Sequence, residues 1–272
     1  MHATTTWDPQ QHLRRSGPRT RPFHDLLAHV PELPTSPARI VDLGCGSGGL
    51  TAVLAERWPD AHITGLDNSV EGLDEAAAHA GETAGGGHID FVHADIGTWS
   101  PAERFDLVIS NAAIQWVPNQ PEHFAGWTRT LSPGGVFAFQ VPDNAGSPSH
   151  AVFRELCTSR RWRDRLGAVA RHMFEVYDPA EYVDHLAALG FTVNAWETSY
   201  AHVLQGGDPF QGWINGTGMR PVLNALADDP EAVGEFLASY RARLGEAYPV
   251  RPYGTVFTFR RVFAVARREA GA

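Results

Sequence analysis

The sequence predicts an α/β fold built on a mostly parallel sheet, and two observations support this prediction. From residue 39 to residue 141, short apolar runs typical of strands alternate with helical patterns, as in repeated strand–helix–strand units. Polar side chains directly follow these strand candidates, where ligands bind in open α/β sheets. The 272 residues are 43% hydrophobic and 19% charged, which suits one large core or a core with an appended cap.

The first strand candidate leads into a glycine-rich turn. An apolar pair at residues 40–41 precedes the sequence DLGCGSGG, and a helical segment follows directly. Gly44, Gly46 and Gly48 permit positive φ angles or a close approach of a ligand to the backbone, and the following helix offers free N–H groups. The turn is therefore predicted to hold a polar ligand. Asp42 lies inside this motif, where its carboxylate would repel a pyrophosphate and attract an ammonium group.

Three further strand candidates end in polar residues. They are residues 62–66 before Asp67, residues 89–93 shortly before Asp95, and residues 105–109 shortly before Asn111. Asp67 lies at about the separation from the glycine turn at which nucleotide-binding folds place an acid for a ribose diol. Because the carboxyl ends of parallel strands meet at one edge of a sheet, we expect these side chains to share one ligand site with the glycine turn.

At these residues the chain resembles the class I S-adenosylmethionine-dependent methyltransferases. The matching motifs occur in the family's order: VDLGCGSG at 41–48, GLDNS at 65–69, ADI at 94–96 and LSPGGV at 131–136. The resemblance implies a Rossmann-like fold with a mostly parallel seven-stranded sheet and a terminal antiparallel hairpin. It implies S-adenosyl-L-methionine as cofactor and S-adenosyl-L-homocysteine as its product, with Asp67 on the ribose hydroxyls and Asp95 on the adenine amino group. The cofactor-binding residues it implies are Asp42, Gly44, Cys45, Gly46, Asp67, Asn68, Asp95, Ile96 and Asn111.

Beyond residue 141 the regular alternation stops. Helices are predicted at residues 148–162 and from residue 179 to before Gly190, strands at 191–203 and 255–266, and an interrupted helical region at 210–248. The glycine-rich residues 81–88 are predicted to form a surface loop. We therefore predict four parts: an N-terminal arm or lid with the first helix at 1–38, a cofactor-binding core at 39–203, an inserted helical cap at 204–252, and the final core strand at 253–272.

Charge and cysteine content limit the partners. A formal net charge of −9, with no basic block interleaved with aromatic residues, disfavours a nucleic-acid substrate. The two cysteines are too few for a disulfide framework, and the sequence has neither an 18-residue apolar stretch nor a secretory leader pattern, so a cytoplasmic location without membrane contact is expected.

All basic residues are arginine, which excludes Schiff-base chemistry and a P-loop. The scattered histidines predict no metal site, and the oligomeric state stays open.

A narrower resemblance spans nearly the whole chain. The motifs WDP at 7–9, RTRP at 19–22, NAAIQWVP at 111–118, QVPDN at 140–144, TGMRP at 217–221 and FRRVF at 259–263 look like those of the trans-aconitate methyltransferases. The resemblance implies formation of a monomethyl ester of trans-aconitate or a closely related polycarboxylate, and arginine side chains suit such carboxylates. The predicted substrate-binding residues are Trp7, His12, Arg19, Gln115, Trp116, Arg220 and Arg261.

The predicted reaction depends on positioning. A carboxylate is ionised at neutral pH and needs no base, so His12 is a candidate only if a base is required. His12 and Arg15 replace a Tyr and a Phe of the family pattern, which makes the arm more basic. Two alternatives stay open: O- or C-methylation of a specialised metabolite, with His12 or His150 as base, and a non-catalytic adenosylmethionine-binding module. A nicotinamide-dependent oxidoreductase is disfavoured by Asp42.

Overall fold

The chain divides into two compact units. The computed structural model describes residues 20–171, 176–206, 210 and 219–269. Of these, residues 20–142, 176–197 and 262–269 form the core unit, and the others form the helical unit. This division differs from the predicted one, which assigned residues 143–175 and 198–203 to the core and 253–261 to its final strand.

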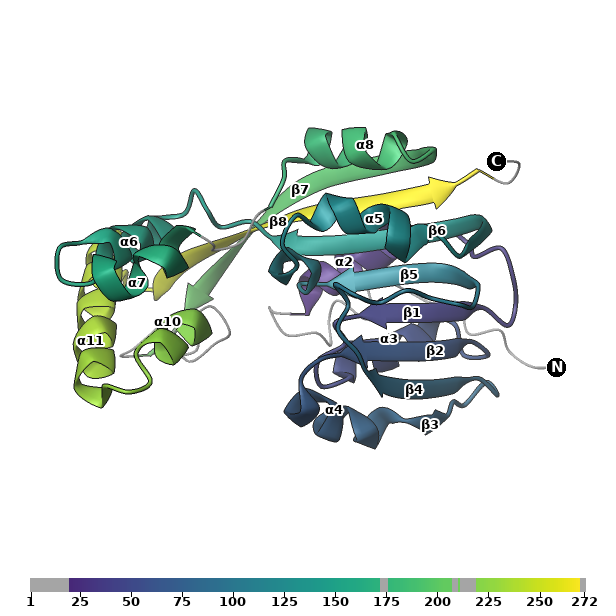
Figure 1. The fold of residues 1–272 in the computed structure, drawn as a ribbon, viewed down its shortest axis with the longest axis horizontal. Coiled ribbons are helices and arrows are strands. Elements are labelled where there is room, and N and C mark those ends of the chain that lie inside the picture. The colour runs from purple at the N-terminus through teal and green to yellow at the C-terminus, as the bar shows by residue number, and fades with distance from the viewer. Residues whose placement is uncertain (1–19, 172–175, 207–209, 211–218, 270–272) are drawn as a thin grey trace. The chain divides into compact units, whose positions relative to one another are not determined.

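The core unit contains an eight-stranded sheet in the order β3-β4-β2-β1-β5-β6-β8-β7 (Figure 1). The pairs β1–β2, β1–β5, β2–β4 and β5–β6 are parallel, whereas β8 runs opposite to β7 and β6 in Figure 1, as the predicted terminal hairpin requires. Strands β7 and β8 also extend into the helical unit. The strands are β1 (Arg39–Leu43), β2 (His62–Asp67), β3 (Gly81–Glu82), β4 (His88–His93), β5 (Phe105–Asn111), β6 (Leu131–Pro142), β7 (Phe191–Leu204) and β8 (Thr255–Arg268).

Strand β3 is one strand more than the predicted seven, and it lies where a loop was predicted. Gly81 and Glu82 pair antiparallel with Ile89 and His88 of β4. The Thr83 N–H donates to the Gly87 carbonyl at 3.0 Å, so the glycine-rich segment closes a hairpin instead of forming an open loop.

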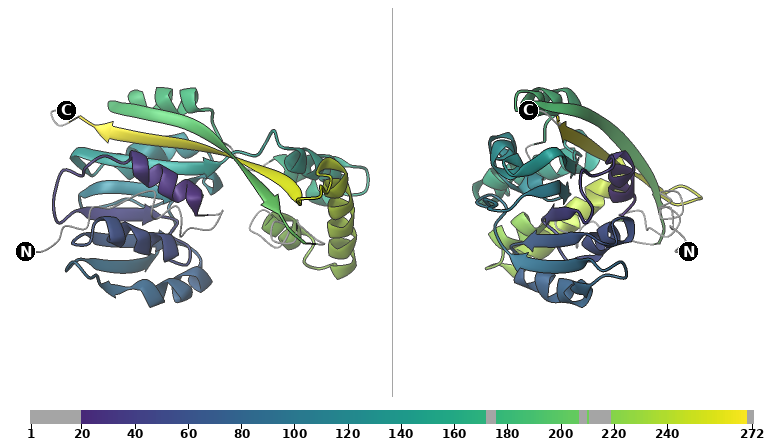
Figure 2. Two further views of the ribbon diagram at one scale, coloured as in Figure 1. Left: turned by 180° about the vertical axis from the view of Figure 1, so that it is seen from behind. Right: turned by 90° about the vertical axis from the view of Figure 1, so that its right-hand side faces the viewer.

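Helices cover both faces of the sheet in the core unit. Helices α2 and α3 lie on one face, and α5 and α8 lie on the other (Figures 1 and 2). Helices α2, α5 and α8 each carry a proline in the first turn, where no backbone N–H is needed. The elements are α2 (Arg21–His29), α3 (Gly49–Arg57), α4 (Val70–Ala76), the 3-10 helices η1 (Ala77–His79) and η2 (Ile114–Trp116), α5 (Gln120–Thr128) and α8 (Pro179–Ala187).

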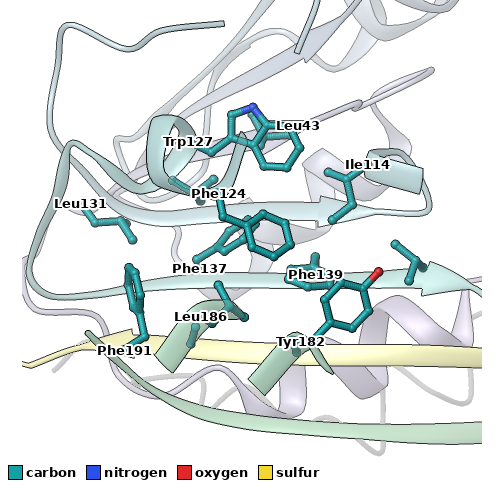
Figure 3. Close-up of a cluster of buried hydrophobic side chains, with 14 of the residues drawn as sticks. Leu43, Ile114, Phe124, Trp127, Leu131, Phe137, Phe139, Tyr182, Leu186 and Phe191 are labelled. Atoms are coloured by element: carbon teal, nitrogen blue, oxygen red, sulfur yellow. The ribbon is translucent and has the colours of Figure 1, made fainter. Parts of the chain in front are cut away.

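An aromatic cluster packs β6 against α5 and α8 (Figure 3). The ring centroids of Phe137 and Phe139 in β6 lie 5.1 Å apart, and Phe124 of α5 lies 5.5 Å and 5.7 Å from them. Tyr182 of α8 lies 5.0 Å from Phe139, and its hydroxyl donates to Gln120 Oε1 at 3.1 Å. All four rings are fully buried. Because burying each phenylalanine contributes about 1.5–3 kcal/mol, this cluster holds the strands that carry the site in place.

The helical unit has its own apolar core. It contains α6 (Pro148–Thr158), α7 (Arg163–Arg171), α10 (Arg220–Ala225) and α11 (Pro230–Ala247). The helix predicted at residues 148–162 is confirmed at its start but ends earlier, because Ser159 is extended and ends α6. Phe153 of α6 lies 6.1 Å from both Phe236 and Tyr240 of α11, which explains why α6 belongs to this unit. Of the helices in the described ranges, none combines the length and the apolar composition that crossing a membrane requires.

Candidate active site

The glycine turn after β1 is held by the neighbouring strand. The N–H groups of Gly44 and Cys45 both donate to the Leu66 carbonyl of β2, at 2.8 and 2.9 Å. Gly44 has a φ of +79°, and a Cβ added there would lie only 2.1 Å from the Cβ of Ala113. Gly46 has a φ of +55°, and a Cβ added there would meet nothing within 4 Å. The turn is therefore closely packed beneath Gly44 and open beside Gly46.

Asp42 presents an unused acceptor to this turn. Its side chain is 2% exposed, and its Oδ2 accepts a hydrogen bond from Thr51 Oγ1 of α3 at 2.6 Å. Its Oδ1 is buried and has no hydrogen-bond partner among the described residues. Burial raises the pKa of Asp42 to about 6, the Thr51 hydrogen bond lowers it, and the charge of Asp67 raises it. A buried acceptor without a partner is costly, so Oδ1 fits a ligand that brings hydrogen-bond donors and positive charge.

Asp67 joins the glycine turn to the next helix. It ends β2, and its Oδ2 accepts the N–H of Gly46 at 2.7 Å while its Oδ1 accepts the N–H of Ser69 at 2.8 Å. Ser69 is the N-cap of α4, because its hydroxyl accepts the Gly72 N–H. An ionised carboxylate has about four lone-pair sites, so each oxygen of Asp67 keeps capacity for a ligand hydroxyl.

The strand register brings the other predicted cofactor residues to the same edge of the sheet. Asp67 of β2 lies opposite His93 of β4, and Asp95 follows His93 by two residues. Asp95 is exposed, and its Oδ1 accepts the Gly97 N–H at 2.8 Å. Asn68 is exposed as well, whereas the half-buried Ile96 accepts the Trp127 indole N–H on its carbonyl at 2.8 Å. These residues frame the carboxyl ends of β2 and β4.

Cys45 is a packing residue in this setting. It is buried, and burial together with the charges of Asp42 and Asp67 raises the pKa of its thiol. The thiol is therefore neutral at physiological pH and has little nucleophilic character. Within the described ranges no group of three or more histidine, cysteine or carboxylate side chains is arranged to hold a metal ion.

Amide side chains line the ends of β5 and β6. Asn111 lies opposite Gln140, and its Oδ1 accepts from Gln140 Nε2 at 2.7 Å. Gln115 of η2 donates from Nε2 to the Ala112 carbonyl at 2.7 Å. The buried Oε1 atoms of Gln115 and Gln140 have no partner among the described residues. The sequence prediction missed Gln140 and Thr51, although a glutamine in the apolar strand VFAFQV is a recognisable signal.

Several predicted substrate residues cannot be placed. Trp7, His12 and Arg19 lie outside the described residues, as does Arg15, which departs from the family pattern. Arg220 begins α10, but its side chain belongs to the part of the chain left undescribed. In the core unit, Trp116 of η2 is 44% exposed.

The adjacent arginines of β8, Arg260 and Arg261, differ in their ion pairs and hydrogen bonds. Arg260 pairs through its guanidinium with Asp143, and its backbone N–H donates to Asn144 Oδ1 at 3.0 Å. The half-buried Arg261 has no ion-pair partner in the described ranges, and its Nε is buried without a hydrogen bond. Burial lowers the pKa of Arg261 to about 10, while the nearby Tyr200 raises it. Arg260 is therefore engaged by the protein, whereas no ion pair to Arg261 is seen among the described residues.

The sheet order, the glycine turn and the acid that ends β2 define a class I S-adenosylmethionine-dependent methyltransferase, and a family model described as a methyltransferase domain matches residues 40–135. The chain is 57% identical to the trans-aconitate 2-methyltransferase of Streptomyces avermitilis, over 98% of this chain and 99% of that protein. The enzymes of that name from Streptomyces coelicolor and Rhodococcus jostii are 54% and 45% identical, over 100% and 96% of this chain and 90% and 99% of theirs. The chain belongs to the trans-aconitate 2-methyltransferase family.

Solved structures share the fold at low sequence identity. A putative methyltransferase from Bacillus halodurans is similar with a TM-score of 0.54 and 14% identity, over 89% of this chain and 96% of that one. An S-adenosylmethionine-dependent methyltransferase from Mesorhizobium loti has a TM-score of 0.51 and 21% identity, over 92% and 98%. Phosphoethanolamine N-methyltransferase 2 of Haemonchus contortus, solved with S-adenosyl-L-methionine, has a TM-score of 0.50 and 16% identity, over 90% and 51%. These similarities confirm the predicted methyltransferase fold.

Proposed function

We propose that this enzyme esterifies one carboxylate of trans-aconitate, or of a closely related polycarboxylate, to a monomethyl ester. The observation that supports this substrate is the similarity of nearly the whole chain to relatives named trans-aconitate 2-methyltransferase, at up to 57% identity. The buried Nε of Arg261, which has no hydrogen-bond partner among the described residues, supports an anionic substrate. When bound, adenosylmethionine would supply a methyl group on a sulfonium to a carboxylate oxygen, and S-adenosylhomocysteine would be its product.

The residues of the core unit fit this cofactor. In the proposed assignment Asp42 Oδ1 accepts from the ammonium of the methionine part, because it is a buried acceptor without a protein partner. The open side of Gly46 leaves room beside the backbone, and Asp67 accepts the ribose hydroxyls on the lone pairs that its two backbone donors leave. Asp95 accepts from the adenine amino group. The proposed lining is completed by Gly44, Cys45, Asn68, Ile96 and Asn111.

The protein's task toward the acid is to bind and orient it. A carboxylate is ionised at neutral pH, so holding it in reactive geometry supplies most of the barrier lowering, about 7–11 kcal/mol in favourable cases. The proposed substrate contacts remain Trp7, His12, Arg19, Gln115, Trp116, Arg220 and Arg261. We propose a small polycarboxylate as partner, not a nucleic acid, and a cytoplasmic site of action. The free, buried Cys45 and Cys157 suit such a reducing compartment.

The alternative of hydroxyl or carbon methylation has less support. His150, its candidate base, is buried, and burial together with Arg154 lowers its pKa to about 4. A base is most effective when its pKa lies near the working pH, so His150 is a poor proton acceptor for a hydroxyl at neutral pH. The non-catalytic alternative is disfavoured by the glycine turn and its acids, which are arranged as cofactor binding needs.

A substrate-panel assay tests the proposed function. The purified protein is incubated with adenosylmethionine and each of trans-aconitate, cis-aconitate, citrate, isocitrate and itaconate, and the product mass is measured. The expected result is a gain of one methyl group, with the highest kcat/KM on trans-aconitate. Cofactor binding without turnover of any acid in the panel would contradict the proposal.

Adenosylmethionine affinity is expected to fall about tenfold between pH 7 and pH 5. Because burial raises the pKa of Asp42 to about 6, lowering the pH neutralises the carboxylate that attracts the ammonium. In the ligand-free protein the sign is opposite: ionising this buried group costs stability as the pH rises from its ordinary pKa of 3.8 toward 6. Titration calorimetry at pH 5, 6 and 7 measures the binding effect.

The Asp42→Asn variant is the control for this pH dependence. It removes the titrating carboxylate, so its weaker affinity should stay nearly constant over the same range. A pH slope equal to that of the wild type would show that another group is responsible.

A further inference from the structure

Gln140 is a buried polar residue in an otherwise apolar part of β6. It is 2% exposed and follows Phe137, Ala138 and Phe139, which are fully buried. A buried polar side chain is costly unless its hydrogen-bonding groups are paired. Gln140 pairs only one end of its amide: Nε2 donates to Asn111 Oδ1 at 2.7 Å, whereas the buried Oε1 has no partner among the described residues. The bond to Asn111 is therefore what this glutamine contributes.

The strand register places Asn111 and Gln140 on the same face of the sheet as Asp42. Asp42 lies opposite Ile109 of β5, and Asn111 follows Ile109 by two residues. Gln140 lies opposite Asn111. Alternate residues of a strand share a face, as do residues directly opposite on neighbouring strands, so the three polar side chains cross β1, β5 and β6 on one face. The aromatic cluster of Figure 3 lies on the other face, against α5 and α8.

The backbone directly after Asn111 is strained. Ala112 has a φ of +54°, in the left-handed region that favours glycine. Its N–H donates to the Gln140 carbonyl at 2.9 Å, and its carbonyl accepts from Gln115 Nε2 at 2.7 Å. The Cβ of the next residue lies against the glycine turn. Strain of this kind persists where the surrounding contacts fix it, and it is concentrated at ligand sites. The end of β5 is therefore fixed beside the glycine turn.

The Asn111 side chain keeps a donor for a ligand. It is half-buried, and because Gln140 engages its Oδ1, the part of the amide without a hydrogen bond to a described residue is the N–H2 group. An N–H2 group donates and so suits an anionic oxygen. The methionine part of adenosylmethionine carries a carboxylate beside the ammonium proposed for Asp42. A donor on β5 next to an acceptor on β1 matches these two charges.

We propose that Gln140 is a positioning residue for the cofactor: it turns the Asn111 amide so that the N–H2 group, and not the oxygen, faces the carboxylate of the methionine part. The two ends of an amide have nearly the same shape, and without Gln140 nothing among the described side chains selects one orientation. In the reversed orientation the Asn111 oxygen would repel the carboxylate. This inference rests on the proposed cofactor lining, which includes Asn111, and it holds for any methylated acid.

Calorimetric titration of Gln140→Met tests this proposal. Methionine keeps the length of the side chain and removes both polar groups. We expect the affinity for S-adenosylhomocysteine, which carries the same ammonium and carboxylate, to fall about five- to tenfold. Binding of methylthioadenosine, which lacks the amino-acid part, should change less than about twofold. The melting temperature should stay the same or rise, because the variant no longer buries an unpaired oxygen.

A double-mutant cycle with Asn111→Ala shows whether Gln140 acts through Asn111. Asn111→Ala should weaken S-adenosylhomocysteine binding about tenfold or more, since it removes a donor to a charged group. The double variant should bind no more weakly than Asn111→Ala alone, because Gln140 then has no amide to orient. Losses that multiply in the double variant would overturn the positioning role.

Gln120→Met is the matched control, because Gln120 is a fully buried glutamine of the core unit whose Oε1 accepts from the Tyr182 hydroxyl. It should lower the melting temperature and leave both affinities unchanged. Wild-type affinity for S-adenosylhomocysteine in Gln140→Met, or an equal loss of affinity for both ligands, would overturn the proposal. A melting temperature lowered as far as in Gln120→Met would show a structural role instead.

These binding measurements are independent of the acid substrate. Failure of the wild type to methylate any acid of the panel is a separate result, which refutes the proposed function and leaves the test of Gln140 in place.

Discussion

Asp67→Ala is expected to weaken adenosylmethionine binding by about 100-fold or more. The substitution removes the acceptor proposed for two ribose hydroxyls, and each hydrogen bond to a charged group contributes about 1.5–3 kcal/mol. It also releases the N–H groups of Gly46 and Ser69, which the carboxylate holds at 2.7 and 2.8 Å. The glycine turn and the start of α4 therefore lose their common anchor. Calorimetric titration of the purified variant measures the change.

Asp90→Ala is the matched control for this experiment. Asp90 is an exposed acid of β4, and its carboxylate pairs with His88. The Asp90→Ala substitution removes the same charge from the neighbouring strand β4 without changing the glycine turn. Cofactor affinity should therefore change less than twofold. Wild-type affinity in Asp67→Ala, or an equal loss in both variants, would refute the ribose assignment.

Alanine substitutions at Gly44 and Gly46 are expected to act in different ways. At Gly44 the new Cβ would lie 2.1 Å from the Cβ of Ala113 on a backbone with a φ of +79°. We expect the free energy of unfolding to fall by about 3 kcal/mol or more, from overpacking and backbone strain combined. At Gly46 no atom lies within 4 Å of the new Cβ, so the cost to folding should be about 1 kcal/mol, from the positive φ alone.

The affinity for adenosylmethionine should distinguish Gly46→Ala from a control variant, Gly49→Ala. Gly46→Ala should reduce adenosylmethionine affinity by about 100-fold while the protein stays folded, because its methyl group fills the open side of the turn. Gly49→Ala adds a Cβ in open space without a positive φ, and it should keep wild-type stability and affinity. Chemical denaturation and calorimetry measure the two effects. Full affinity in Gly46→Ala would show that the cofactor does not approach this side of the turn.

The cofactor-binding part of the sheet could be predicted because its signals are local. Glycines at fixed positions after an apolar strand define the turn, and the acid at the end of β2 follows at a separation set by one helix and one strand. The chain order of β1, β2, β4 and β5 was predictable for the same reason. The positions of Asp42 and Asp67 at the turn follow from this local pattern.

The features that the sequence did not predict depend mostly on contacts between residues far apart in the chain. Helix α6 belongs to the helical unit because Ser149 binds the hydroxyls of Tyr240 and Tyr248, about a hundred residues later, and no local pattern encodes that contact. The local sequence does not separate the roles of Arg260 and Arg261, and only the family resemblance singled out Arg261. The structure shows that Arg260 pairs with Asp143. The two-residue strand β3 was missed because glycines usually indicate loops.

The most direct measurement uses adenosylmethionine with a carbon-13-labelled methyl group, the purified enzyme and trans-aconitate, with the product analysed by nuclear magnetic resonance. The predicted result is a single labelled methyl signal, coupled to a carboxyl carbon as an ester and lost on mild alkaline hydrolysis. An alkali-stable label on a carbon of the acid, or no label in the acid at all, would contradict carboxylate esterification by this enzyme.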